Sequence, residues 1–343
     1  MMNRAFGKHL GRFIDGLAWR GMHAIARRQE SNLSPSFPEL REDFHAEAAH
    51  FFPAPSEQTL QQVRCGAWWK QGKYWRRDVA FPSALPSPRA ANNTVYAQTY
   101  ATERACNRPV VIVLHGLMNL TTAAYRPFLR AIVAAGASAH ILELPYHHRR
   151  TPRGSISGDL FHTSDLALTQ HAVQQSVADV RLLLRYLRQT GATIIGVLGF
   201  SLGAWIGGLV ACAEPDLDFA MLGMPPNHLN ELVWHTPLGA QLSRRFAALG
   251  WSQEYTAKFY DRLDPLSYRP LLPRERIQFY AAEFDTLLAL EQVRELQRAW
   301  GAPALRIYPH GHLSVMISPQ LHRDFQKDFA AQIAQPRSEW AAV

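Results

Sequence analysis

From residue 109 onward, the chain alternates short apolar runs with longer segments of helical periodicity. In one helical segment Val173, Val177, Val180 and Leu184 recur at three- or four-residue spacing, and Gly191 follows it. Short apolar strands separated by amphipathic helices are typical of a mostly parallel sheet with helices on both faces. This region is therefore predicted to form one α/β domain. Its expected strands are Val110–Leu114, Ala139–Leu144, Ile194–Leu198, Phe219–Leu222, Ile277–Ala281 and Leu305–Tyr308.

Upstream of these runs the pattern changes to the two-residue alternation of exposed sheets. It covers Lys73–Phe81 and Thr94–Thr102, with a turn rich in Pro, Ser and Asn between them, and predicts an antiparallel pair leading into the main sheet. Residues 30–63 are punctuated by proline and are expected to be a connector, in which Ser56 could cap a short helix. The predicted organisation is therefore an N-terminal helix and connector over residues 1–63, followed by an α/β domain over residues 64–343.

Residues 3–28 show the apolar stripe of an amphipathic helix with an arginine-rich opposite face. The chain carries a net charge of +8, and much of the excess lies here, where six Lys or Arg residues oppose one Asp within residues 1–28. Such a helix either lies on an anionic membrane surface or docks on its own domain or on a second subunit as a homodimer contact. Docking is favoured because the four glycines of this segment lower its intrinsic helicity and permit close packing. No basic stripe is interleaved with aromatics, so nucleic acid is not an expected partner.

The three cysteines, Cys65, Cys106 and Cys212, are scattered and fit neither a disulfide framework nor a zinc site. No apolar run reaches the length of a membrane span, and the basic N-terminus has no continuous apolar region before a cleavage site. We expect a cytoplasmic protein, with peripheral membrane contact through the N-terminal helix as the alternative. No metal and no cofactor is expected.

Two segments interrupt the alternation of strands and helices. Residues 145–164 form a long polar connection, and loops of this length often have a function. Residues 225–272 form a larger insertion, in which Ser252 is expected to cap a helix. The insertion is predicted to be a cap over the sheet. Its aromatic residues, among them Trp234 and Phe246, are expected to line a substrate pocket.

The sequence Gly-Phe-Ser-Leu-Gly at residues 199–203 joins an apolar strand to a helical segment. In a sharp strand-to-helix turn, side chains two positions before and after the serine would clash with neighbouring backbone, which explains Gly199 and Gly203. The turn projects the hydroxyl of Ser201 from the carboxyl edge of the sheet. The N–H of Leu202 and the dipole of the following helix would then face a developing negative charge. Ser201 is predicted to be a nucleophile.

A serine nucleophile needs a histidine base that is held by a carboxylate. Asp285 and His312 each follow an expected strand, in the order Ser-Asp-His. His310 is the alternative base, but Gly311 gives His312 more freedom to turn back toward the serine. Asp264 is the alternative acid, whereas Glu283 is expected to face the other side of the sheet.

His115-Gly116 follows the first strand of the α/β region. The turn after it is expected to supply the second oxyanion donor, the N–H of Leu117, with that of Met118 as the alternative, and Met118 is also expected to contact substrate. His115 is interpreted as a structural residue that braces this turn. His147 and His148 lack metal-ligand spacing and are expected to be loop residues near substrate, and Cys212 is expected to pack in the core.

With these motifs the sequence resembles the α/β-hydrolase superfamily, especially bacterial serine esterases and dienelactone-hydrolase-like members, over roughly residues 72–335. The resemblance rests on His-Gly after one strand, Gly-Phe-Ser-Leu-Gly after another and the two late loops. It implies an eight-stranded, mostly parallel sheet with helices on both faces, a cap at residues 225–272 and cofactor-free acyl transfer to water. The sequence departs from family patterns in having His-Gly-Leu-Met at the oxyanion turn and Ala282 where a glycine is usual.

The expected function is hydrolysis of a small-molecule carboxylic ester through an acyl-enzyme intermediate. The same triad could serve a thioesterase, a lactonase or an amidase. An alternative from a different class is a non-catalytic, membrane-associated binding protein that uses the fold for recognition. A complete Ser-Asp-His set argues against that alternative, because a binding module has no use for it.

Overall fold

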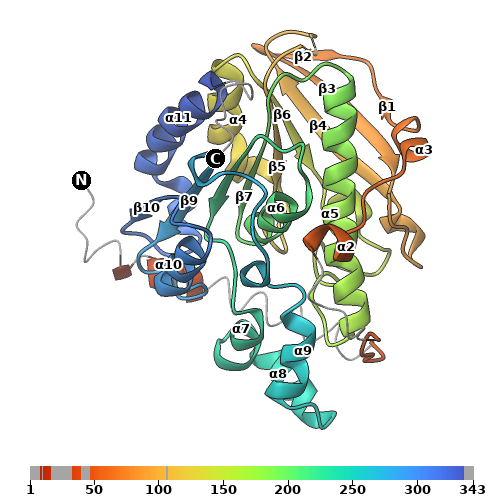
Figure 1. The fold of residues 1–343 in the computed structure, drawn as a ribbon, viewed down its shortest axis with the longest axis vertical. Helices are drawn as coiled ribbons and strands as arrows, with labels where there is room; N and C mark the ends of the chain where they lie inside the picture. The colour runs from red at the N-terminus through yellow and green to blue at the C-terminus, as the bar shows by residue number, and fades with distance from the viewer. Residues whose placement is uncertain (1–7, 10, 17–32, 40–46, 106, 336–343) are drawn as a thin grey trace.

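A computed structural model describes residues 8–9, 11–16, 33–39, 47–105 and 107–335. Its centre is a ten-stranded sheet (Figure 1), in which nine strands follow the order β1-β3-β4-β6-β5-β7-β8-β9-β10 and β2 pairs with β3. The first four strands are β1 (Arg64–Cys65), β2 (Trp69–Gln71), β3 (Tyr74–Pro82) and β4 (Thr94–Ala101). The other six are β5 (Val110–Leu114), β6 (Ser138–Leu142), β7 (Ile195–Phe200), β8 (Phe219–Gly223), β9 (Ile277–Ala282) and β10 (Ala304–Tyr308).

The six strands from β5 to β10 are mutually parallel, and each coincides with one of the predicted apolar runs. Strands β5 to β9 are buried along their whole length, as expected for strands covered on both faces. The predicted antiparallel pair is present as β3 and β4, and β4 joins β6 in antiparallel orientation. The fold class is confirmed, but the sheet has ten strands rather than eight because β1 and β2 add short antiparallel pairs to β3.

Helices cover both faces of the sheet. On one face α4 (Arg126–Ala134) packs against α11 (Pro319–Ala334). On the other, α5 (Leu166–Gln189) packs against α6 (Leu202–Ala213), and α10 (Leu290–Ala299) lies beside β9 (Figure 1). The parallel strands thus lie between two helical layers, and their carboxyl ends point toward the cap.

The insertion at residues 225–272 forms three helices below the sheet in Figure 1, namely α7 (Leu229–His235), α8 (Ala240–Ala248) and α9 (Gln253–Tyr260). The side chain of Ser252 accepts a hydrogen bond from the N–H of Tyr255, so the predicted cap of α9 is present. Leu242 and Phe246 are the buried residues of α8. The insertion is therefore a helical cap at the carboxyl edge of the sheet.

The connector contains α2 (Ala48–Phe51) and α3 (Glu57–Leu60), and Ser56 caps α3 as predicted. Phe52 and Leu60 belong to the same hydrophobic core as the sheet. The boundary at residue 63 stays a prediction, although side chains on both of its sides share one core. Of the helix predicted at residues 3–28, residues 8–9 and 11–16 are described and are helical; the remainder lies outside the described residues.

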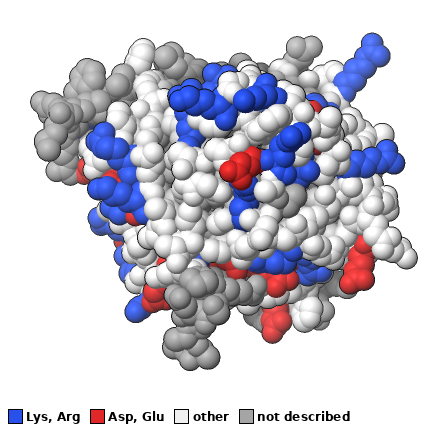
Figure 2. Space-filling model, turned by 90° about the horizontal axis from the view of Figure 1, so that it is seen from above, with Lys and Arg blue, Asp and Glu red and all other residues white. Residues whose placement is uncertain are grey.

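No helix within the described ranges is long and apolar enough to cross a membrane. On the face seen from above in Figure 2, Lys and Arg side chains lie in small groups separated by uncharged residues.

Candidate active site

Ser201 occupies the turn between β7 and α6 with φ at 54° and ψ at −121°, a conformation that L-residues rarely adopt. A Cβ atom at Gly199 would overlap the carbonyl group of Gly203, and one at Gly203 would overlap the carbonyl oxygen of Leu114. Both glycines are therefore required by the close approach of α6 to the neighbouring strands. The sequence motif has the geometry that it predicted, with the serine at the first position before the helix.

Asp285 and His312 follow β9 and β10, and their side chains are in direct contact. Nδ1 of His312 lies 2.7 Å from Oδ2 of Asp285, and both side chains are buried. The other carboxylate oxygen of Asp285 accepts hydrogen bonds from the N–H groups of Leu287 and Leu288, at 2.8 and 2.9 Å. One oxygen of Asp285 thus stabilises its own loop while the other orients the imidazole, which leaves Nε2 available for proton transfer.

The pKa of His312 is raised by this environment. Burial lowers the pKa, but the charge and hydrogen bond of Asp285, together with the charge of Asp15, outweigh that effect. Carboxylates that stabilise the imidazolium make the histidine a better acceptor for the serine proton.

The alternative residues lie in other environments. Asp264 accepts hydrogen bonds from the N–H groups of Leu229 and Leu266, both at 2.9 Å, so it caps the start of α7 and the turn after the cap. Burial raises the pKa of Asp264 to about 6. His310 makes no hydrogen bond to Asp285, and among the described residues its Nδ1 has no hydrogen-bond partner. The geometry therefore favours Asp285 and His312 over both alternatives.

The turn after β5 is held by buried side chains. The hydroxyl of Tyr125 accepts a hydrogen bond from the N–H of Gly116 at 2.9 Å. His115 is buried, and its Nε2 accepts the N–H of Leu144 at 3.1 Å, so it braces the turn as predicted. Among the described residues, the N–H groups of Leu117 and Leu202 make no hydrogen bond. Two free donors beside the serine fit an oxyanion hole.

Met118, the alternative donor, is occupied: its N–H donates to Nε2 of His147 at 3.2 Å. His147 in turn donates from Nδ1 to the carbonyl oxygen of Pro145 at 2.8 Å. The pKa of His147 is lowered to about 3, mainly by burial, so it stays neutral. His147 lies in the 145–164 loop as predicted, where it is completely buried and supports the turn after β5.

Ser201 and His312 line one narrow, mostly apolar cavity with about 70 Å³ of water-accessible space. Leu117 and Leu202 also line it, so the four residues predicted for the reaction centre are brought together. The cap and the 145–164 loop supply much of the remaining wall. These wall residues are Phe161, His162, Trp205, Pro226, Leu229, Leu232, Val233, Leu238, Gly239, Tyr260, Leu287 and Leu288.

The three side chains predicted to contact substrate, Met118, Trp234 and Phe246, do not line this cavity. Trp234 donates from its indole N–H to Thr256 and packs against Phe246, which is completely buried inside the cap. The sequence places Trp234 and Phe246 on helices of the cap, but it does not reveal which face of each helix points toward the sheet. The aliphatic residues Leu229, Leu232 and Val233 of α7 line the cavity instead.

Asp15 is a site residue that the sequence reasoning missed. It lies in the N-terminal helical segment and is 1% exposed. Its carboxylate accepts the N–H groups of His312 and Leu313 at 2.9 and 3.1 Å. The only sequence signal was its place as the single acidic residue in a basic helix.

Cys212 is completely surrounded by protein, and burial raises the pKa of its thiol, so it is a core residue as predicted. Across the described residues, no group of three or more His, Cys, Asp or Glu side chains could hold a metal ion.

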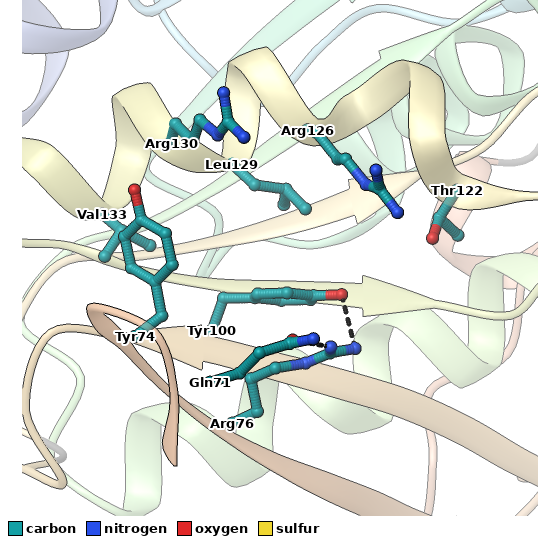
Figure 3. A pocket seen from close by; sticks show the side chains of 9 residues that line it. All are labelled: Gln71, Tyr74, Arg76, Tyr100, Thr122, Arg126, Leu129, Arg130 and Val133. Atoms are coloured by element: carbon teal, nitrogen blue, oxygen red, sulfur yellow. Dashed lines mark hydrogen bonds between the residues drawn. The ribbon is translucent and has the colours of Figure 1, made fainter. Parts of the chain in front are cut away.

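A second, wider cavity of about 360 Å³ lies between α4 and the β2–β3 hairpin (Figure 3). It shares no lining residue with the first. Arg126 points toward the hydroxyl of Tyr100, and the guanidinium of Arg76 donates to that hydroxyl at 2.8 Å and to Gln71 and Gln98. The residues that line this cavity include no histidine and no carboxylate.

Comparison with known proteins agrees with this arrangement. Residues 57–223 match a family model described as alpha/beta hydrolase domain containing 18. The chain is 32% identical over 250 residues to an uncharacterised protein of Mycobacterium tuberculosis strain H37Rv and to its counterpart in strain CDC 1551. These alignments cover 69% of this chain and 57% of each relative, so the chain spans little more than half the length of those proteins.

Solved structures share the fold at low sequence identity. An acetyl xylan esterase from Paenibacillus sp. R4 has a TM-score of 0.63 at 16% identity, covering 86% of this chain and 96% of that one. Acetyl xylan esterase 1 from Thermoanaerobacterium sp. JW/SL YS485 has a TM-score of 0.57 at 14% identity, covering 87% and 100%. At such identities the likeness shows a common fold.

Proposed function

We propose that this protein, a member of the α/β-hydrolase superfamily, hydrolyses carboxylic esters with short acyl groups through an acyl-enzyme intermediate on Ser201. One observation carries the proposal. A strained serine and a histidine held by a buried carboxylate line the same apolar cavity.

In the proposed reaction the Ser201 hydroxyl attacks the ester carbonyl carbon and transfers its proton to Nε2 of His312. The N–H groups of Leu117 and Leu202 stabilise the tetrahedral oxyanion. The alkoxide leaves as the alcohol after taking the proton from His312, and the acyl group stays on Ser201. Water then attacks the acyl-enzyme with His312 as base, releases the acid and restores the serine.

The small size of the cavity is the reason for proposing a short acyl group. About 70 Å³ of this cavity is accessible to water, against about 360 Å³ of the wider cavity beside α4. An acetyl group fits such a space better than a long chain, and the two structures of similar fold named above are acetyl xylan esterases. We also propose a cytoplasmic location, which suits the free thiols of Cys65 and Cys212.

The test is labelling with a fluorophosphonate probe together with hydrolysis of p-nitrophenyl esters of increasing acyl length. The wild-type protein should be labelled and should prefer acetate. Ser201→Ala should lose labelling and at least about 10³-fold in kcat, with unchanged circular dichroism. Ser243→Ala in α8, which does not line the cavity, is the matched control and should behave as wild type. Absence of labelling in the folded wild-type protein would contradict the proposal.

A further inference from the structure

The N-terminal segment reaches the catalytic loops from the far end of the sequence. Residues 11–16 are helical, and Gly11 lies directly against Gly311, the residue before the catalytic histidine. A Cβ atom at Gly11 would lie 2.5 Å from the backbone nitrogen of Gly311 and 2.9 Å from its Cα. The two backbones can approach this closely only because both positions are glycine.

This contact places the carboxylate of Asp15 between two loops. Oδ2 accepts the backbone N–H of His312, and Oδ1 accepts that of Leu313. Oδ2 also accepts the hydroxyl of Thr286 at 3.3 Å, and Thr286 follows the catalytic acid directly in sequence. One buried carboxylate therefore joins the loop of the base to the loop of the acid.

We propose that Asp15 is a positioning residue, which fixes the His312 loop against the Asp285 loop so that the imidazole faces Ser201. This role rests on the proposed esterase function. Backbone N–H groups that donate to a carboxylate form strong hydrogen bonds, and small displacements of a catalytic base are costly. The N-terminal segment is then a part of the active centre, outside the region matched by the family model.

The position of Asp15 has a second consequence, which an effect on loop geometry alone would not produce. Its negative charge raises the pKa of His312 in addition to the larger effect of Asp285. Across the cavity lie His162 and Tyr260, which are hydrogen-bonded to each other at 2.9 Å, and burial lowers the pKa of His162 to about 4, so that imidazole is neutral above that pH. Removing the Asp15 charge should lower the pKa of His312, and the acid limb of kcat/KM should move to lower pH.

The experiment compares Asp15→Asn with wild type in the full-length chain. Asparagine keeps the size of the side chain but can accept with only one oxygen and carries no charge. We expect kcat/KM to fall by about tenfold to a hundredfold, and the acid limb to shift down by roughly half a pH unit. Unchanged kcat/KM and an unchanged acid limb in a folded Asp15→Asn protein would overturn the proposal.

A matched pair of glycine variants tests the docking without changing Asp15. Gly11→Ala introduces the overlap with Gly311, whereas a Cβ atom at Gly16 meets nothing within 4 Å. Gly11→Ala should lower kcat/KM, and Gly16→Ala should not. Equal activities of the two would contradict the role of the segment, even if Asp15→Asn failed to fold.

Fluorophosphonate labelling separates this proposal from the proposed function. If wild type is not labelled and hydrolyses no ester, the esterase function fails, and the role of Asp15 fails with it. If wild type is labelled and active but Asp15→Asn and Gly11→Ala are both as active as wild type, only the role of Asp15 fails.

Discussion

The guanidinium of Arg150 and the carboxylate of Asp179 lie 2.9 Å apart, and both side chains are completely buried. Arg150 belongs to the long 145–164 connection and also donates to the carbonyl oxygens of Asn92 and Glu143. Asp179 lies within α5 and also accepts the hydroxyl of Ser83 at 2.7 Å. The ion pair therefore fixes the long loop to the helical layer, and through the loop it supports Phe161 and His162 in the cavity wall.

Removing one member of such a pair leaves the other charge buried without its partner. We expect Arg150→Ala to lower the free energy of unfolding by about 3–5 kcal/mol, as measured by urea denaturation. The control is Arg149→Ala, because Arg149 pairs with Glu143 at the surface and should contribute about 1 kcal/mol or less. Similar losses for the two arginines would contradict the structural role given to Arg150.

The two late histidines should differ sharply in activity. His312→Ala removes the group that contacts Asp285 and should reduce kcat to near the level of Ser201→Ala. His310→Ala should stay within roughly tenfold of wild type, since His310 is not hydrogen-bonded to the acid. Assays of both variants on p-nitrophenyl acetate test this, and the reverse ranking would transfer the role of base to His310.

The course of the sheet was predictable because burial on both faces demands uninterrupted apolar residues, as in β5 and β7. Ser201 was predictable for a similar reason. The close approach of α6 leaves no room for side chains at positions 199 and 203, and the sequence has glycine at both. Asp285 and His312 could be assigned by their places after strands whose ends meet at one edge.

Asp15 and the cavity wall could not be predicted in that way. Asp15 contacts His312 across 297 positions of sequence, and no local pattern encodes such a pairing. Trp234 and Leu232 lie two positions apart in α7, yet only Leu232 lines the cavity. Which of them does so depends on the rotation of the helix over the sheet, which tertiary packing decides.

Acid should destabilise the protein through its buried histidines. The pKa of His140 and of His147 is lowered to about 3, and that of His162 to about 4, in each case mainly by burial. The unfolded chain protonates these groups below about pH 6.5, whereas the folded protein does not. Each therefore contributes stability that is present above pH 6.5 and is lost as the pH falls toward its folded value.

The expected loss is up to about 1.4 kcal/mol per pH unit for each histidine. His162→Gln should make the dependence of the unfolding free energy on pH shallower by about one proton between pH 6 and pH 4.5. His235→Gln is the control, because His235 is exposed at the end of α7. Urea denaturation at several pH values measures the slopes, and an identical slope for His162→Gln and wild type would contradict the prediction.

The cap should determine the preferred acyl length through α7. Val233 lines the cavity that contains Ser201, and Gly239 packs directly on the backbone of Val233, so the chain at the start of α8 cannot move closer to α7. Shortening Val233 to alanine should therefore enlarge the cavity instead of letting the cap collapse into it. We expect Val233→Ala to raise kcat/KM for butyrate relative to acetate by about threefold to tenfold, in line with about one methylene group of pocket space. Leu249→Ala, at an exposed position after α8, should leave that ratio unchanged. A panel of p-nitrophenyl esters from acetate to octanoate measures the ratio, and equal profiles for the two variants would show that α7 does not set the acyl length.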